Sequence, residues 1–192
     1  MVIYTRVCLL NFKIVISFFY DCKGEIDLVE RYPLKNGLEI AFENMSGLRS
    51  VSFGVWVGAG TRFETKKENG ISHFIEHLIF KGTGKRTAKD IAQQMDAMGG
   101  QINAYTTKEY TCYYTRVLDK HFESALEILS DMVLSSSFSE DNIEKEKKVI
   151  EEEIDMYLDA PEELVHDALE EGIGVKQDLE CLFAAQKNHL MK

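Results

Sequence analysis

His73, Glu76 and His77 are the residues of this sequence whose types and spacing could do chemistry. On a helix, residues three and four apart share one face, so both imidazoles and the carboxylate point the same way. Two neutral imidazoles at this spacing can bind one zinc ion, and the glutamate lies close enough to act on a water molecule there. The order His-x-x-Glu-His is the inverted form of a zinc-peptidase motif. The alternative, a hydrogen-bonded core histidine, suits one such residue better than two beside a carboxylate.

The helix that must carry this motif is predicted over residues 70–80, and its other faces are apolar. They consist of Ile71, Phe74, Ile75, Leu78 and Ile79. A helix this apolar must be buried, so its polar patch cannot simply face water. A metal ion in the interior would satisfy two imidazoles and a carboxylate.

A catalytic zinc ion usually has three protein ligands, and an acidic helix predicted after Ser139 offers the third. In a helical projection, Glu146 and Glu153 lie between two halves of an apolar arc. The halves are Ile143, Ile150, Ile154 and Tyr157 on one side and Val149 and Met156 on the other, while Glu144, Glu151, Glu152 and Asp155 fall on the exposed side. Two buried carboxylates need a cation, and a zinc ion would supply it. Glu153 is the better direct ligand, with Glu146 as a supporting carboxylate. The alternative is that helix curvature brings both to water.

The elements around this site mix strands and helices without a steady βαβ rhythm. This order favours an α+β fold, with a mixed or antiparallel sheet covered by helices. Alternating apolar residues predict strands at 38–42 and 51–57, and two further strands are expected at 101–106 and 110–118. Helices are predicted at 87–98, 122–134 and 139–158 and from Pro161 onward, with Thr87 as an N-cap and Gly99-Gly100 as a stop.

The composition indicates a globular protein, with 192 residues of which 45% are hydrophobic. A net charge of −10 argues against a nucleic-acid partner. The four cysteines form no CxxC pair, which suits a reducing cytoplasm. Residues 7–20 are strongly apolar but too short to span a bilayer comfortably, and no small-residue cleavage site follows them. We therefore expect a cytoplasmic protein with no membrane partner, in which this segment is a strand or an extension unrelated to the main domain.

Three segments, in this order, resemble the pitrilysin and mitochondrial processing peptidase family of insulinase-like (inverzincin) zinc metallopeptidases, and the bacterial processing proteases most. They are residues 70–83 (GISHFIEHLIFKGT), 99–106 (GGQINAYT) and 144–154 (EKEKKVIEEEI), and the resemblance covers about residues 29–170. It implies a zinc metalloendopeptidase that hydrolyses extended peptides, with one Zn²⁺ per chain. The implied ligands are His73, His77 and Glu153, with Glu76 as general base and Glu146 as an assisting carboxylate.

The resemblance also implies where a peptide substrate binds. The peptide would pair with an edge strand around Asn103, Ala104 and Tyr105, where main-chain hydrogen bonds give affinity with loose sequence preference. Ordinary strand packing is the alternative role for Asn103 and Tyr105.

Members of this family normally continue well beyond the length of this chain, with a second, similarly folded half closing over the substrate. The resemblance therefore implies an N-terminal zinc metallopeptidase domain at residues 29–171. Residues 1–28 form an extension outside the resemblance, and residues 172–192 form a divergent or truncated tail. A second homologous half or subunit would complete the site. The alternative function is a truncated zinc-binding remnant or partner subunit with little activity alone.

Overall fold

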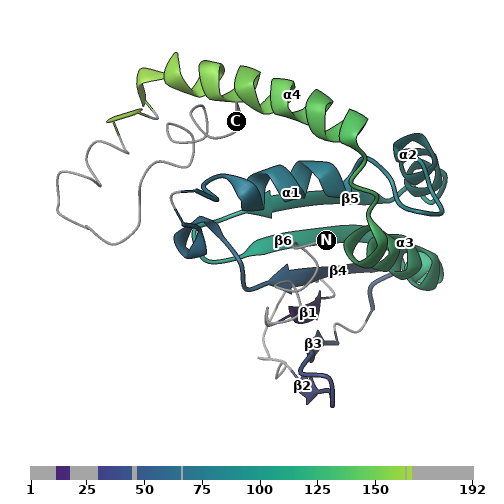
Figure 1. The fold of residues 1–192 in the computed structure, drawn as a ribbon. Helices are drawn as coiled ribbons and strands as arrows, with labels where there is room; N and C mark the ends of the chain where they lie inside the picture. The colour runs from purple at the N-terminus through teal and green to yellow at the C-terminus, as the bar shows by residue number, and fades with distance from the viewer. Residues whose placement is uncertain (1–11, 18–29, 45–46, 66, 163, 166–192) are drawn as a thin grey trace.

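The computed structural model describes residues 12–17, 30–44, 47–65, 67–162 and 164–165. The described part contains one sheet and four named α-helices, which is the predicted α+β class (Figure 1). The strands are β1 (Phe12–Ser17), β2 (Glu30–Pro33), β3 (Glu39–Glu43), β4 (Ser50–Val57), β5 (Gln101–Thr106) and β6 (Thr111–Leu118). The helices are α1 (Ile71–Ile79), α2 (Ala88–Ala97), α3 (Phe122–Ser135) and α4 (Glu140–Leu158).

The sheet has the strand order β2-β3-β1-β4-β6-β5, which leaves β5 at one edge. Figure 1 shows this order from the purple strands at the bottom to β5 beneath α1. The β1–β3 pair is parallel and the other pairs are antiparallel, so the sheet is mixed. Within the apolar N-terminal segment, Phe12–Ser17 pairs with both β3 and β4. Of the two alternatives predicted for this segment, the strand is therefore the one that the structure shows.

The main core lies between the sheet and the helices. Alternation along β4 and β6 sends every second side chain to this face, so that Val51, Phe53 and Val55 lie opposite Val117, Thr115 and Tyr113. Helix α3 covers these residues with Ala125, Ile128, Leu129 and Met132, and α2 adds Ile91 and Met95. None of the helices in the described ranges is long and apolar enough to cross a membrane.

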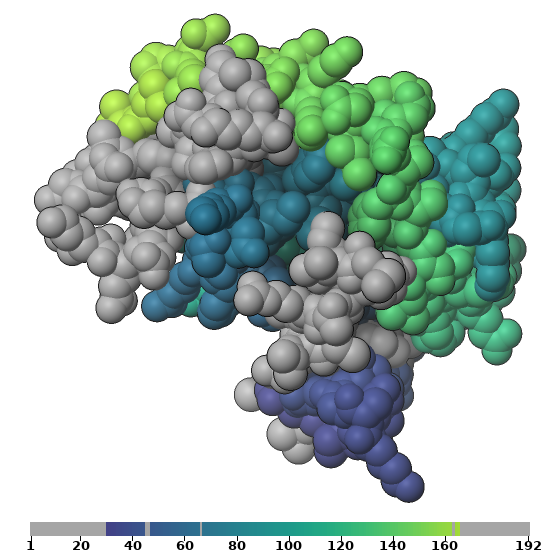
Figure 2. Space-filling model, viewed as in Figure 1, coloured from purple at the N-terminus to yellow at the C-terminus, as the bar shows by residue number. Residues whose placement is uncertain are grey.

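Helix α1 is buried on two sides, which explains its nearly continuous apolar sequence. Ile75 and Ile79 pack in the main core against the sheet. Phe74 and Leu78 form a second cluster with Ile150 and Ile154 of α4. In Figure 1, α4 is accordingly the outermost layer, lying across α1. Figure 2 shows its green surface above the blue-teal surface of the α1 region.

Helix α4 packs along one side only, and this corrects one prediction. Ile150 and Ile154 are fully buried, but Val149 is 39% and Met156 66% exposed. The second half of the predicted buried arc is therefore wrong, because among the described elements only α1 lies beneath α4. At the end of α4, Pro161 begins a further helical turn, and the rest of the helix predicted there lies outside the described residues.

The start of α1 is fixed by a side chain from outside the helix. Its N-cap, Gly70, has a φ of 86°, a left-handed conformation that favours glycine, and it offers no side chain to cap the helix. The Glu64 carboxylate takes this role, accepting hydrogen bonds from Gly70 N at 2.6 Å and Ser72 N at 2.8 Å. A negative charge at this position also complements the helix dipole.

We expect the replacement of Glu64 by Ala to lower the free energy of unfolding by about 2 kcal/mol, because it leaves two helix-terminal N–H groups without their charged acceptor. Urea denaturation of the metal-free chain measures this effect. Glu152→Ala, at an exposed position on α4, should change stability by less than about 0.5 kcal/mol. Equal midpoints for the Glu64 variant and the wild type would contradict the capping role.

Candidate metal centre

The polar face of α1 lies between the two apolar contacts of the helix. The stripe that meets α4 borders His77 and His73, whereas the stripe that meets the sheet borders Glu76. Consequently the histidines face the carboxylates of α4, and the glutamate faces the end of β5. The structure brings together His73, His77 and Glu153, whose nearest ligand atoms all lie within 4.8 Å of one another.

The distances within this triad fit a zinc ion. Nε2 of His73 lies 3.2 Å from Nε2 of His77. Oε2 of Glu153 lies 3.9 Å from the first of these nitrogens and 3.6 Å from the second. A point equidistant from the three atoms lies about 2.1 Å from each, which agrees with zinc–ligand distances of about 2.0–2.2 Å. Two nitrogens and one carboxylate oxygen are also the donor set of many catalytic zinc sites.

His73 has the protonation state that a metal ligand needs. Burial, together with the neighbouring His77, lowers the pKa of His73 from 6.5 to about 4. The ring is therefore neutral at pH 7 and keeps a nitrogen lone pair.

Glu146 contacts the second ring nitrogen of His77, on the side away from the triad. This residue is 4% exposed, and its Oε2 lies 3.3 Å from Nδ1 of His77. A carboxylate can only accept, so this contact places the imidazole proton on Nδ1 and leaves Nε2 directed at the triad. The other carboxylate oxygen, Oε1, lies 2.6 Å from Nζ of Lys81. Glu146 therefore touches a triad member rather than completing the triad.

Glu76 is held from the side of the sheet. Thr106 at the end of β5 donates a hydrogen bond from Oγ1 to Oε2 of Glu76 at 2.6 Å. The Thr106 hydroxyl lies 3.3 Å from that of Thr111, which in turn donates to the carbonyl of Ala59 at 2.9 Å. Burial raises the pKa of Glu76, and the Thr106 hydrogen bond acts in the opposite direction. A partly desolvated carboxylate with a raised pKa is suited to accept a proton.

The structure places Asn103, Ala104 and Tyr105 in the edge strand β5, outside the triad of ligand atoms. Thr107 N donates to Tyr110 O where the β5–β6 hairpin turns. The antiparallel alternation therefore turns the main-chain groups of Ala104 and Thr106 toward the open edge. In this structure the N–H of Ala104 donates to the side chain of Asn103 at 2.9 Å. Tyr105 is 40% exposed, and its ring lies edge-on to those of Tyr110 and Tyr114.

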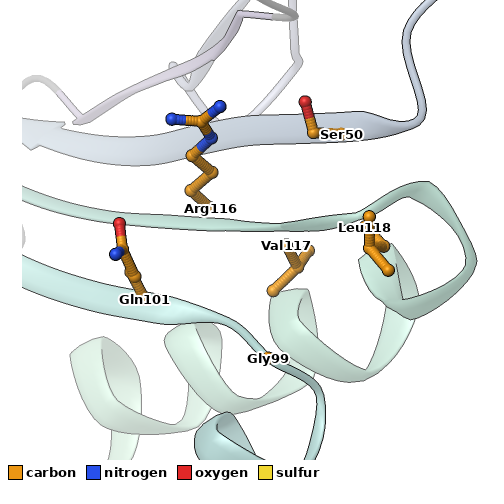
Figure 3. Close-up of a pocket in the computed structure, with 6 residues that line it drawn as sticks. All are labelled: Ser50, Gly99, Gln101, Arg116, Val117 and Leu118. Atoms are coloured by element: carbon orange, nitrogen blue, oxygen red, sulfur yellow. The ribbon is translucent and has the colours of Figure 1, made fainter.

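A pocket of about 260 Å³ lies at the opposite end of β5 (Figure 3). It is lined by Ser50, Gly99, Gln101, Arg116, Val117 and Leu118. Gln101 begins β5, whereas Thr106, which holds Glu76, ends it. The pocket is thus separate from the metal centre.

Three residues of the site were not predicted from sequence: Glu64, Lys81 and Thr106. Gly70 has no side chain to cap the helix, which signals that the N-terminus of α1 needs an acceptor from elsewhere in the chain. This signal does not identify Glu64 as the acceptor. For Lys81 the available signal was its position four residues after His77, which places it on the same side of the helix end. Thr106 gave no signal, because its role depends on how α1 packs on the sheet.

Two helical histidines, a carboxylate from a second helix and a half-buried glutamate beside them match the donor set of a zinc centre of the inverted His-x-x-Glu-His type. The chain belongs to the insulinase family of peptidases. Residues 39–180 match the family described as Insulinase (Peptidase family M16). Zinc is the cofactor that this family and this donor set support.

Two similar bacterial proteins carry the name of zinc protease. A Bacillus subtilis protein named "uncharacterized zinc protease YmxG" is 53% identical over 142 residues, covering 74% of this chain and 35% of that protein. A Streptomyces coelicolor protein named "uncharacterized zinc protease SCO5738" is 47% identical over 147 residues, covering 76% of this chain and 32% of that protein. Among solved structures, a protease from Helicobacter pylori superposes with a TM-score of 0.64 at 28% identity, covering 67% of this chain and 31% of that one. The chain thus spans about a third of the length of these relatives.

Proposed function

We propose that this chain carries the catalytic zinc centre of a metalloendopeptidase that hydrolyses extended peptides. The observation that carries the proposal is the triad of His73, His77 and Glu153 with Glu76 beside it. In this proposal residues 29–171 form the zinc-bearing domain, and β1 from the preceding segment joins its sheet. A second homologous half or subunit completes the substrate site.

The roles follow from the contacts of each side chain. When bound, zinc supplies Lewis acidity, polarising the scissile carbonyl and lowering the pKa of a water molecule. The zinc ion would be held by His73, His77 and Glu153. Glu146 keeps His77 in the tautomer that leaves Nε2 for the metal. Glu76 takes the proton of the attacking water on its carboxylate and returns it to the leaving amine.

The proposed substrate site is the open edge of β5. An extended peptide there would pair with the outward main-chain groups of Ala104 and Thr106, as in other strand-addition complexes. It would displace the Asn103 side chain from the N–H of Ala104. Because Thr106 also holds Glu76, this edge leads directly to the proposed base.

Peptide hydrolysis tests the proposal. The purified chain is loaded with Zn²⁺ and assayed on quenched fluorescent peptides, alone and with the remaining part of a full-length relative supplied as a separate polypeptide. Turnover in either form that a chelator abolishes and Zn²⁺ restores supports the proposal, and activity only with the added part assigns the chain as one half of the enzyme. A chain that binds zinc but hydrolyses nothing in either form would instead favour the zinc-binding remnant.

Thr106 provides a milder test of the same arrangement. We expect Thr106→Val to lower kcat about tenfold, since Glu76 loses a short hydrogen bond worth about 1.5 kcal/mol. Zinc content should stay unchanged, because Thr106 touches none of the three ligands. Thr106→Ser keeps the hydroxyl and should restore most of the rate. Equal rates for the valine and serine variants would show that the hydroxyl does not position Glu76.

A further inference from the structure

Lys81 lies where the metal-binding helix meets α4. It follows Phe80, the C-cap of α1, and comes four residues after His77. Its Nζ lies 2.6 Å from Oε1 of Glu146, whose other oxygen faces Nδ1 of His77. Among the described residues, this is the one contact of a lysine or arginine with a carboxylate that joins the end of α1 to α4.

The backbone of Lys81 is attached to the same helix. Its carbonyl accepts a hydrogen bond from Nδ2 of Asn142 at 3.5 Å, one turn before Glu146 on α4. The next residue, Gly82, accepts from Ser137 N at 3.0 Å, in the connection between α3 and α4. Lys81 therefore contacts α4 at two points, its carbonyl at Asn142 and its ammonium group at Glu146.

The carboxylate of Glu146 requires a cation because its side chain is only 5% exposed. Lys81 supplies that charge and occupies Oε1. This leaves Oε2 as the oxygen that accepts from His77 and orients its ring. Without the lysine, the buried carboxylate would turn toward water, and this change would release His77 from its present orientation.

We propose that Lys81 is a positioning residue of the metal centre, which acts through Glu146 on His77 and thereby tunes metal affinity. The proposal rests on the proposed zinc site. It does not depend on whether the chain hydrolyses peptides.

The test is the dissociation constant for Zn²⁺, measured on the full chain by competition with a chromophoric chelator. Lys81→Met removes the charge and keeps most of the side-chain length. We expect it to weaken binding about tenfold, the lower end of the range for changes outside the ligand sphere. Lys81→Arg keeps the charge and should restore affinity to within about threefold. Lys145→Met is the matched control, because it removes an exposed lysine paired with Asp141 on α4, and it should not change the constant.

A double-mutant cycle tests the route of the effect. In a Glu146→Gln background, Lys81→Met should have no further effect on Zn²⁺ affinity, because the group through which it acts is gone. This double variant also lacks the uncompensated buried charge, so it remains informative if Lys81→Met alone does not fold. The visible absorption bands of the Co²⁺-loaded chain should change in Lys81→Met and stay as in the wild type in Lys145→Met.

Three results would overturn the proposal: wild-type Zn²⁺ affinity in Lys81→Met, the same loss in both backgrounds, or an equal loss in Lys145→Met. Tight zinc binding without any hydrolysis would contradict the proposed function and leave this inference standing. A wild-type chain that binds no zinc would overturn both.

Discussion

Replacement of Glu76 by Gln should abolish peptide hydrolysis while leaving zinc bound. The amide matches the carboxylate in shape and can still accept the hydrogen bond from Thr106, but it cannot take a proton. General base catalysis contributes about 10²–10⁴-fold, so kcat/KM should fall by that factor, or about 3–5 kcal/mol of transition-state stabilisation. The residue is not within the triad of ligand atoms, and the zinc content should therefore stay at one ion per chain.

The measurement combines metal analysis with initial rates, in whichever form of the protein hydrolyses peptides. Glu123→Gln, at an exposed position in the first turn of α3, is the control for the same chemical change and should leave both quantities unaltered. Turnover retained in the Glu76 variant would remove this residue from the base role. Loss of zinc from it would mean that Glu76 is a ligand.

The elements could be predicted because their patterns are local. Thr87 caps α2 with a capping box to Asp90, and Ser139 caps α4, both as the sequence indicates. Period-two alternation placed β3 and β4 correctly. Strand β2 was not predicted, since all four of its residues are exposed and no alternation marks it. The sheet order was not predicted either, because it depends on contacts between distant segments.

The burial of Glu146 could be predicted from sequence, because apolar residues on α4 flank it in projection. The same reasoning failed for Val149 and Met156. A helical projection shows which residues share an arc, but not how wide a surface the neighbouring element covers. Helix α1 covers only the arc from Glu146 to Ile154, and Glu153 lies at the margin of that arc with its side chain 34% exposed.

This marginal position separates the roles of the two carboxylates. A fully buried glutamate needs a permanent cation, and Glu146 has one in Lys81. A glutamate at the margin can remain hydrated until a metal ion arrives, and Glu153 has both histidine Nε2 atoms within 4 Å. Burial and charge thus favour Glu153 over Glu146 as the ligand, and the two can be distinguished by experiment.

Replacement of Glu153 by Gln should weaken zinc binding by more than about 100-fold, or at least about 2.7 kcal/mol. The substitution removes the negative donor oxygen and leaves the two neutral imidazoles, which cannot hold the ion as tightly. Glu146→Gln changes a contact of His77 rather than a ligand, so we expect a loss of about 10–100-fold. Chelator competition measures both constants, and hydrolysis by the Glu153 variant should recover only in excess zinc.

Glu152→Gln is the matched control, because it makes the same change one residue away on the exposed side of α4. It should bind zinc as the wild type does, which would exclude the summed negative charge of the helix as the cause. If Glu146→Gln lost the ion and Glu153→Gln kept it, the third ligand would be Glu146, and α4 would have to rotate toward His73 to bring that carboxylate into the triad. Comparable losses in all three variants would mean that zinc responds to the acidity of α4 and not to a defined carboxylate.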